Sequence, residues 1–208
     1  MIRVRGVLKS PIKHVIWHTR ISVMGIAALL AVVVIKAVSV EPEIALVIGE
    51  PYEDMRQRSS ASIGAAVPDG VSFSIPQSDA RLRFTDLQYG FFTPQARFFA
   101  VFYNDGLVYS VRMSPQLEPL LLDDTLKLIL DLQDQWRQKG WRAIRPPIAD
   151  TPYWRARLQN ERKGGTTRWQ AANLYQVMLN VGRFDDPKRP NEERYLITLS
   201  IAEPWVKP

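Results

Sequence analysis

An apolar stretch near the N-terminus constrains this chain more than any other feature. Residues 21–40 read ISVMGIAALLAVVVIKAVSV and contain one charged residue, Lys36. A helix of about twenty apolar residues spans the hydrocarbon core of a bilayer. Lys36 stands near the far end, where its long side chain can reach the headgroups. The stretch therefore predicts a transmembrane helix over residues 21–40.

Charged residues are distributed unequally on the two sides of this stretch. Residues 1–20 contain five basic residues and no acidic one, whereas Glu41, Glu43 and Glu50 follow the stretch. Positively charged flanks stay on the cytoplasmic side of a membrane. We therefore expect a cytoplasmic basic leader over residues 1–20 and a periplasmic domain beyond residue 40. This would make the chain a single-pass inner-membrane protein of a Gram-negative cell.

Two other interpretations of the apolar stretch stay open. A signal peptide could be cleaved at the small residues around Ala37-Val38-Ser39, although the leader and the apolar stretch are both long for that purpose. The stretch could also be a buried core helix. A lipid-anchored form is excluded because the chain contains no cysteine.

The basic character of the chain belongs to its N-terminal segment. The net charge is +6, and residues 1–40 contain six basic and no acidic residues. Removing them leaves 21 basic residues against 21 acidic ones, so the domain from Glu41 onward is neutral. A nucleic-acid partner loses its main support, because such binding depends on an excess of positive charge.

Few residues of the outer domain could carry catalysis. Both histidines, His14 and His18, precede the apolar stretch, and cysteine is absent. Ser-His-Asp triads, Cys-His pairs and zinc sites built on histidine or cysteine are therefore excluded there. No phosphate-binding glycine loop is present. We expect no enzyme, no cofactor and no metal, with a hydrolase or transferase that uses unusual residues as the alternative.

The first part of the outer domain predicts one helix and several strands. Pro51 begins a helix that ends near Ser60, and a loop over Ser59–Gly70 follows. We expect strands at Val71–Ile75, Arg81–Thr85, Phe98–Tyr103 and Leu107–Met113. The last two form a hairpin, because Asn104-Asp105-Gly106 is a typical tight-turn sequence. Residues 41–49 could be helical or extended.

The second part predicts a long helix and further strands. Asp123 or Asp124 would cap a helix that continues to Lys139, with Gly140 after it. Its apolar face is expected to consist of Leu126, Ile129, Leu132 and Trp136. The remaining expectations are a short strand at Trp141–Ile144, a helix from Thr151 to about Arg162, and strands that alternate over 175–182 and 195–201.

This order of elements predicts the α+β fold class. We expect an antiparallel sheet with helices packed on one face. The succession of helix, strands, helix and strands suggests two similar halves, 41–115 and 116–208. No repeat of individual residues accompanies that suggestion.

One segment combines tryptophan and arginine in a way that is typical of protein interfaces. Residues 136–169 contain four tryptophans interleaved with basic residues. Arginine and tryptophan are enriched where proteins bind one another. Packing in the core explains Trp136 better, because it lies on a periodic helix face. The candidate partner-binding residues are Trp154, Arg155, Arg157, Arg162 and Trp169.

Part of the outer domain resembles a known group of periplasmic domains. Gly49-Glu50-Pro51 and the hairpin over Phe98–Val111 resemble the small domains of the SmpA/OmlA and beta-lactamase-inhibitor-protein type. The chain departs from the assembly lipoproteins of that group by lacking their lipidated cysteine. The resemblance implies a scaffold for protein binding or inhibition and transfers no binding residue.

These observations favour a membrane-anchored module that binds another protein in the periplasm. The most specific hypothesis is an immunity or inhibitor protein that neutralises a toxin acting on the envelope. The alternative is an accessory or assembly subunit of an envelope or secretion complex.

Overall fold

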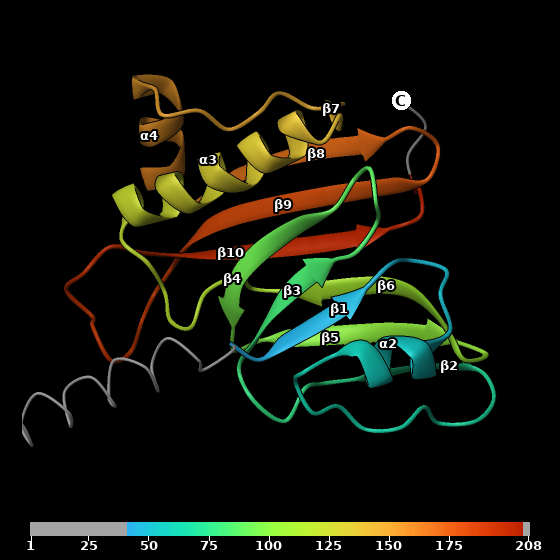
Figure 1. Cartoon of the computed structure of the whole chain (residues 1–208). Helices are drawn as coiled ribbons and strands as arrows, with labels where there is room; N and C mark the ends of the chain where they lie inside the picture. The colour runs from blue at the N-terminus through green and yellow to red at the C-terminus, as the bar shows by residue number, and fades with distance from the viewer. Residues whose placement is uncertain (1–40, 206–208) are drawn as a thin grey trace, which may run out of the picture. The chain divides into compact units, whose positions relative to one another are not determined.

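The computed structural model describes residues 41–205, which form an α+β fold (Figure 1). The predicted leader and transmembrane helix, residues 1–40, lie outside the described residues. No helix between residues 41 and 205 is long and apolar enough to cross a bilayer. The elements follow the chain in the order β1 (Glu43–Leu46), α2 (Tyr52–Arg58), β2 (Val71–Ser74), β3 (Ala80–Phe84), β4 (Phe91–Ala96), β5 (Phe99–Asn104), β6 (Leu107–Met113), α3 (Leu122–Gln138), β7 (Arg142–Ala143), α4 (Pro152–Gln159), β8 (Gly165–Ala171), β9 (Tyr175–Phe184) and β10 (Arg194–Ala202).

The larger sheet has seven strands in the order β2-β5-β6-β10-β9-β8-β7, and all neighbours are antiparallel. The alternation of apolar and polar residues expected over 195–201 is confirmed in β10, where Tyr195, Ile197, Leu199 and Ile201 are buried. Strands from both sides of residue 115 join this sheet, because β6 pairs with β10. The suggested duplication of the two halves stays a prediction.

The hairpin between β5 and β6 forms as the turn sequence predicts. Asn104 pairs with Leu107, so Asp105 and Gly106 alone make the loop. Their φ angles are 47° and 77°. Two successive positive φ angles define the tight turn that matches the twist of a hairpin, and Asp and Gly tolerate them better than other residues.

The smaller sheet contains two strands that the sequence did not clearly indicate. Its three strands lie in the order β1-β3-β4, with β1 parallel to β3. Residues 43–46, left open between helix and strand, are β1. The strand β4 was not predicted, because Pro94 interrupts it and its apolar residues do not alternate regularly.

Helix α3 buries the face that its periodicity predicts. Leu126, Ile129, Leu132 and Trp136 are all at most 1% exposed. Gly140 follows the helix with φ of 85°, the conformation that ends many helices. The predicted cap by Asp123 or Asp124 is wrong. The N-cap is Leu121 and no side chain caps the helix, while both aspartates lie in its first turn.

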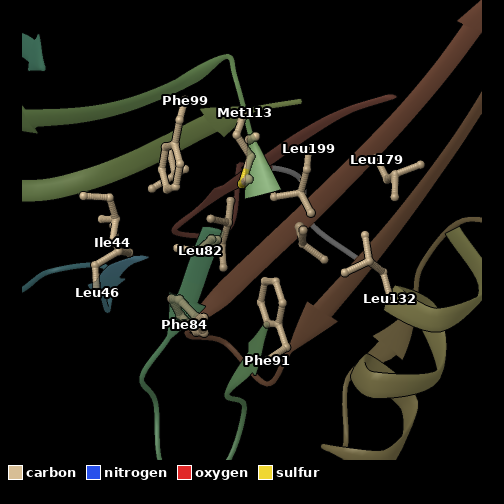
Figure 2. Close-up of a cluster of buried hydrophobic side chains, with 14 of the residues drawn as sticks. Ile44, Leu46, Leu82, Phe84, Phe91, Phe99, Met113, Leu132, Leu179 and Leu199 are labelled. Carbon is tan, nitrogen blue, oxygen red and sulfur yellow. The ribbon is translucent and has the colours of Figure 1, made fainter. Parts of the chain in front are cut away.

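The main core lies between the larger sheet on one side and the smaller sheet and α3 on the other. Figure 2 shows Leu82, Phe84 and Phe91 of the smaller sheet beside Phe99, Met113 and Leu199 of the larger sheet, with Leu132 of α3 nearby. Trp136 contacts both layers, with ring centroids 5.8 Å from Phe91 and 5.9 Å from Trp169. We call the opposite face of the larger sheet the open face.

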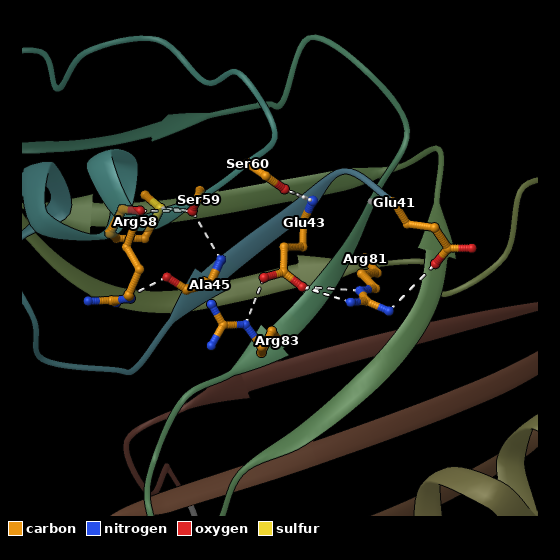
Figure 3. Close-up of polar contacts among 9 residues, drawn as sticks. Glu41, Glu43, Ala45, Arg58, Ser59, Ser60, Arg81 and Arg83 are labelled. Atoms are coloured by element: carbon orange, nitrogen blue, oxygen red, sulfur yellow. Dashed lines mark hydrogen bonds and ion pairs between the residues drawn. The ribbon is translucent and has the colours of Figure 1, made fainter. Parts of the chain in front are cut away.

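Polar side chains cover the outer edge of β1 (Figure 3). The Glu43 and Ala45 N–H groups donate to the Ser60 and Ser59 hydroxyls, each at 3.0 Å. The Arg58 guanidinium donates to the Ala45 carbonyl at 3.0 Å. These bonds satisfy backbone groups that an outer strand would otherwise leave unpaired.

The Glu43 carboxylate ties β1 to β3. Arg81 Nη2 lies 3.0 Å and Arg83 Nε 2.8 Å from its oxygens (Figure 3). Burial alone would raise the pKa of Glu43, but the hydrogen bonds from Arg81 and Arg83 outweigh it and lower the pKa below the ordinary 4.5. The ionised carboxylate is therefore the form that the fold stabilises.

A pH titration of stability tests this arrangement. Because the pKa of Glu43 is lower in the folded state, its stabilisation is complete above about pH 4.5 and is lost as the pH falls through the folded-state pKa. We expect Glu43→Gln to cost about 1–2 kcal/mol at pH 7, where charged hydrogen bonds are lost. The difference from the unsubstituted chain should shrink below pH 4, measured by urea unfolding. A difference that stays constant down to pH 3 would contradict the assignment.

Candidate partner-binding groove

Helix α4 begins and ends through local polar contacts. Thr151 is the N-cap, and its hydroxyl accepts a hydrogen bond from the Trp154 N–H at 3.3 Å. Pro152 stands in the first turn, where a missing N–H has no cost. The helix ends at Gln159, earlier than the predicted Arg162. The Asn160 side chain accepts the Arg162 N–H at 3.1 Å, which favours a turn over another helical residue.

A glycine in β8 allows α4 to lie close to the sheet. Leu158 is the buried residue of α4. A Cβ at Gly165 would lie 3.0 Å from both Leu158 Cδ2 and Val181 Cγ1, and 3.1 Å from Ile148 Cδ1. The absence of a side chain at Gly165 therefore sets the distance between α4 and the sheet.

Substitution of this glycine should loosen α4. We expect Gly165→Ala to lower the free energy of unfolding by about 1–3 kcal/mol, because the added methyl overpacks the contact. Gly182 is the matched control, since a Cβ there meets nothing within 4 Å. Gly182→Ala should change stability by less than about 0.5 kcal/mol. Equal effects of the two substitutions in urea unfolding would contradict this packing.

A groove of about 620 Å³ lies beside α4 at the edge of the larger sheet. We call it the α4 groove. Its lining comes from three segments: the chain after β7, helix α4, and β8. The lining residues are Arg145, Pro146, Tyr153, Trp154, Arg157, Thr166 and Arg168.

Two aromatic rings and a guanidinium form one wall of the α4 groove. Tyr153 and Trp154 have ring centroids 5.6 Å apart in an edge-to-face arrangement. The Arg157 guanidinium lies 5.9 Å from the centre of the Trp154 ring, within the range of a cation–π contact. Tyr153 is 65% exposed although it is a large ring. This wall therefore presents aromatic surface and positive charge together.

The arginines of the α4 groove lack acidic partners among residues 41–205. Most arginines in this range form ion pairs, such as Arg183 with Glu161 and Arg189 with Glu118. The arginines that form no ion pair with a described residue are Arg112, Arg142, Arg145, Arg157, Arg162 and Arg168. Three of these six line the groove.

One of these arginines also has an unsatisfied donor. The Arg168 Nε is buried and has no hydrogen-bond partner in the described part of the chain. A buried donor without a partner is costly, by about 1–3 kcal/mol. Arg168 therefore has no ion pair and also has a buried Nε donor that no described residue satisfies.

The chain segment that carries Arg145 is held in place from α3. The Gln133 amide donates to the Ile148 carbonyl at 2.7 Å and accepts the Ile148 N–H at 3.0 Å. The Ile144 N–H donates to the Arg168 carbonyl at 2.9 Å. These bonds fix the rim of the groove without using its charged groups.

The structure brings two of the five predicted binding residues into the α4 groove. Trp154 and Arg157 line it, at the spacing that places side chains on one helix face. Arg155 instead joins α4 to its surroundings, with Nη1 2.7 Å from Asp123 and Nε 2.5 Å from Asp150. These carboxylates raise the pKa of Arg155.

The other two predicted residues lie elsewhere. Trp169 is 3% exposed, and its Nε1–H donates to the Thr167 hydroxyl at 3.1 Å inside the core. Arg162 is exposed beyond the end of α4 and does not line the groove.

The sequence prediction did not single out four of the residues that contribute polar or aromatic groups. These are Arg145, Tyr153, Thr166 and Arg168. Thr166 and Arg168 belong to β8, which was not predicted as a strand. Recognising that strand would have placed the two residues on one face, because alternate residues of a strand share a face.

A larger cavity of about 770 Å³ has a different character. Its lining includes Phe98 and Leu117, together with Lys188 and two charged residues, Arg97 and Glu118, that already have ion-pair partners. Arg97 lies 3.6 Å from Asp79, and Glu118 lies 2.6 Å from Arg189. The α4 groove is therefore the stronger candidate for binding a charged partner.

Comparisons with known proteins found no relative of this chain. No family model matches this chain, and no curated protein or solved structure matches it either. Residues 41–205 contain no group of three histidine, cysteine, aspartate or glutamate residues that could hold a metal ion. The resemblance to SmpA/OmlA-type domains stays a prediction.

Proposed function

We propose that this chain is a membrane-anchored module that binds an acidic protein in the periplasm through the α4 groove. The observation that carries the proposal is the set of three arginines, Arg145, Arg157 and Arg168, without acidic partners in the described part of the chain. They lie beside Tyr153, which is 65% exposed, and Trp154, which is partly buried against the core.

The groove offers two kinds of contact to a partner. Each guanidinium can donate two parallel hydrogen bonds to one carboxylate, a geometry that lysine does not provide. The rings of Tyr153 and Trp154 add apolar area, and tyrosine, tryptophan and arginine are the residues that contribute most to protein interfaces. A partner with aspartate or glutamate beside an apolar residue fits both contacts.

The charge balance of the domain supports an acidic partner. Residues 141–169 contain Arg142, Arg145, Arg155, Arg157, Arg162, Lys163 and Arg168, against only Asp150 and Glu161. The domain from Glu41 onward is neutral as a whole. Positive charge is therefore concentrated in the segment that builds the groove, which favours the approach of an anionic surface.

Location in the periplasm rests on the N-terminal segment. The apolar residues 21–40 have the length of a membrane-spanning helix, and the basic residues before them favour a cytoplasmic N-terminus. The outer domain would then meet its partner on the far side of the inner membrane.

The most specific form of the proposal is an immunity or inhibitor protein that blocks an envelope-acting toxin by covering its surface. The tests are co-expression and co-purification of the full chain, in detergent, with a toxin encoded by a neighbouring gene. We expect a complex at micromolar concentration that weakens as salt is raised, because exposed charges are screened. Absence of a complex at that concentration would remove the immunity form of the proposal.

An anchor exchange separates this form from an assembly subunit. Replacing residues 1–40 with an unrelated membrane anchor should leave toxin neutralisation intact if the outer domain alone binds the toxin. Loss of activity with a correctly inserted exchange variant would favour an accessory subunit whose anchor itself contacts the complex.

A further inference from the structure

The two sheets have four outer strands, and three of them are blocked against further pairing. Polar side chains cover the outer edge of β1 (Figure 3). Along β4, the Gln135 amide accepts the Phe92 N–H at 2.9 Å and donates to the Phe92 carbonyl at 3.1 Å. The strand β7 has only two residues. Natural proteins protect outer strands by such means.

The fourth outer strand, β2, has no such protection. Val71, Phe73 and the following Ile75 are 71%, 55% and 51% exposed. Residues 71–78, VSFSIPQS, contain no charged side chain. The Phe73 ring lies 5.7 Å from that of Phe102, so the apolar side chains of β2 continue onto the open face of the larger sheet.

The outer side of β2 presents backbone N–H and C=O groups to which another strand could pair. The Asp105 N–H donates to the Gly70 carbonyl at 3.2 Å, so Gly70 and the alternate residues after it point their backbone groups toward β5. The groups of Val71 and Phe73 then point outward. Neither residue forms an outward backbone hydrogen bond within residues 41–205.

We propose that β2 pairs with β2 of a second copy of this chain, antiparallel about a two-fold axis at Phe73. In that register Phe73 meets Phe73, and Val71 meets Ile75 of the other copy. Val71 and Phe73 have outward backbone groups, as an antiparallel hydrogen-bonded pair requires, and the same alternation would place those of Ile75 outward. The same surface serves both copies, as a two-fold interface demands.

The charges on either side of β2 fit this pairing. Asp69 and Asp79 are the acidic residues nearest to β2 in the sequence. Both lie outside the strand, and Asp69 and Gly70 have φ angles of 61° and 81°, so neither aspartate belongs to the paired residues. Residues 71–75 carry no charged side chain, so no like charges face each other between the paired strands.

Dimerisation through β2 leaves the α4 groove free. The strand order places β2 at one edge of the larger sheet and β7 and β8 at the other. The two grooves of a dimer would therefore lie at opposite ends of one continuous sheet. Pairing through β2 is therefore compatible with any occupant of the groove.

Cysteine cross-linking tests the register directly. The chain has no cysteine, so a single introduced thiol is unambiguous. In an antiparallel hydrogen-bonded pair the Cα atoms are about 5.5 Å apart, which a disulfide can span. With mild oxidant, the full chain in detergent should form a covalent dimer when it carries Phe73→Cys. It should form little covalent dimer when it carries Asn180→Cys, a control on the open face, because that thiol lies away from the β2 interface. Equal yields from the two variants would overturn the proposal.

Charge at the two-fold axis supplies the second test. Phe73→Lys places two ammonium groups opposite each other, so the dimer dissociation constant should rise at least about tenfold in light scattering on the full chain. Unchanged far-UV circular dichroism would show that the variant folds. A dimer that survives Phe73→Lys, or an unsubstituted chain that is monomeric throughout the micromolar range, would overturn the proposal.

Discussion

Reversing one charge in the α4 groove should strongly weaken partner binding without unfolding the domain. We expect Arg157→Glu to weaken the complex with the acidic partner about 100-fold, which corresponds to about 2.8 kcal/mol. The substitution removes a carboxylate-binding guanidinium, removes the cation–π contact with Trp154, and adds repulsion. Titration calorimetry of the purified chain with the partner measures the effect.

Arg162→Glu is the matched control for this prediction. Arg162 lies in the same basic segment, has no ion pair with a described residue, and does not line the groove. Its reversal changes the net charge by the same amount, so we expect less than a threefold change in affinity. Equal losses from Arg157→Glu and Arg162→Glu would show that overall charge, and not the α4 groove, selects the partner.

Truncation of Trp136 should cause the largest loss of stability. Trp136 is fully buried and contacts Phe91 and Trp169, so it joins the smaller sheet, α3 and the larger sheet. We expect Trp136→Ala to lower the free energy of unfolding by about 3–5 kcal/mol, because it leaves a cavity between these layers. Urea unfolding followed by circular dichroism measures this change.

Two further variants separate packing from other effects of this tryptophan. The Trp136 Nε1 is buried without a hydrogen-bond partner in the described part of the chain, so Trp136→Phe removes an unsatisfied donor while keeping a ring. Its cost should stay below about 2 kcal/mol. Trp205 is 41% exposed, and Trp205→Ala should change stability by less than about 0.5 kcal/mol. A loss below 1 kcal/mol for Trp136→Ala would contradict its central place in the core.

Elements with a clear periodicity could be predicted from the sequence. The apolar face of α3, the β5–β6 hairpin and the alternating strand β10 formed at the expected residues. In each case a single local pattern, either a helical period, a turn sequence or an alternation, agrees with the tertiary packing. The strands β4 and β8 lack such a pattern, because Pro94 interrupts one and Gly164-Gly165 suggests a loop before the other.

The candidate site could be predicted only in part. Trp154 and Arg157 are three residues apart, so their common helix face follows from the sequence. The ion pair between Arg155 and Asp123 could not be predicted from the sequence, because the two residues are far apart in it. They meet only because α4 packs near the start of α3. Burial of Trp169 depends likewise on β8, which the sequence did not reveal.

Photo-crosslinking in living cells tests the central claim most directly. A photoreactive amino acid replaces Tyr153 in the α4 groove, and a second variant carries it at Leu87, which is fully exposed and does not line the groove. We predict that the variant at position 153 forms a covalent adduct with an exported, acidic protein and that the variant at position 87 does not. An adduct with a cytoplasmic protein, or adducts at position 87 without any at position 153, would contradict the account.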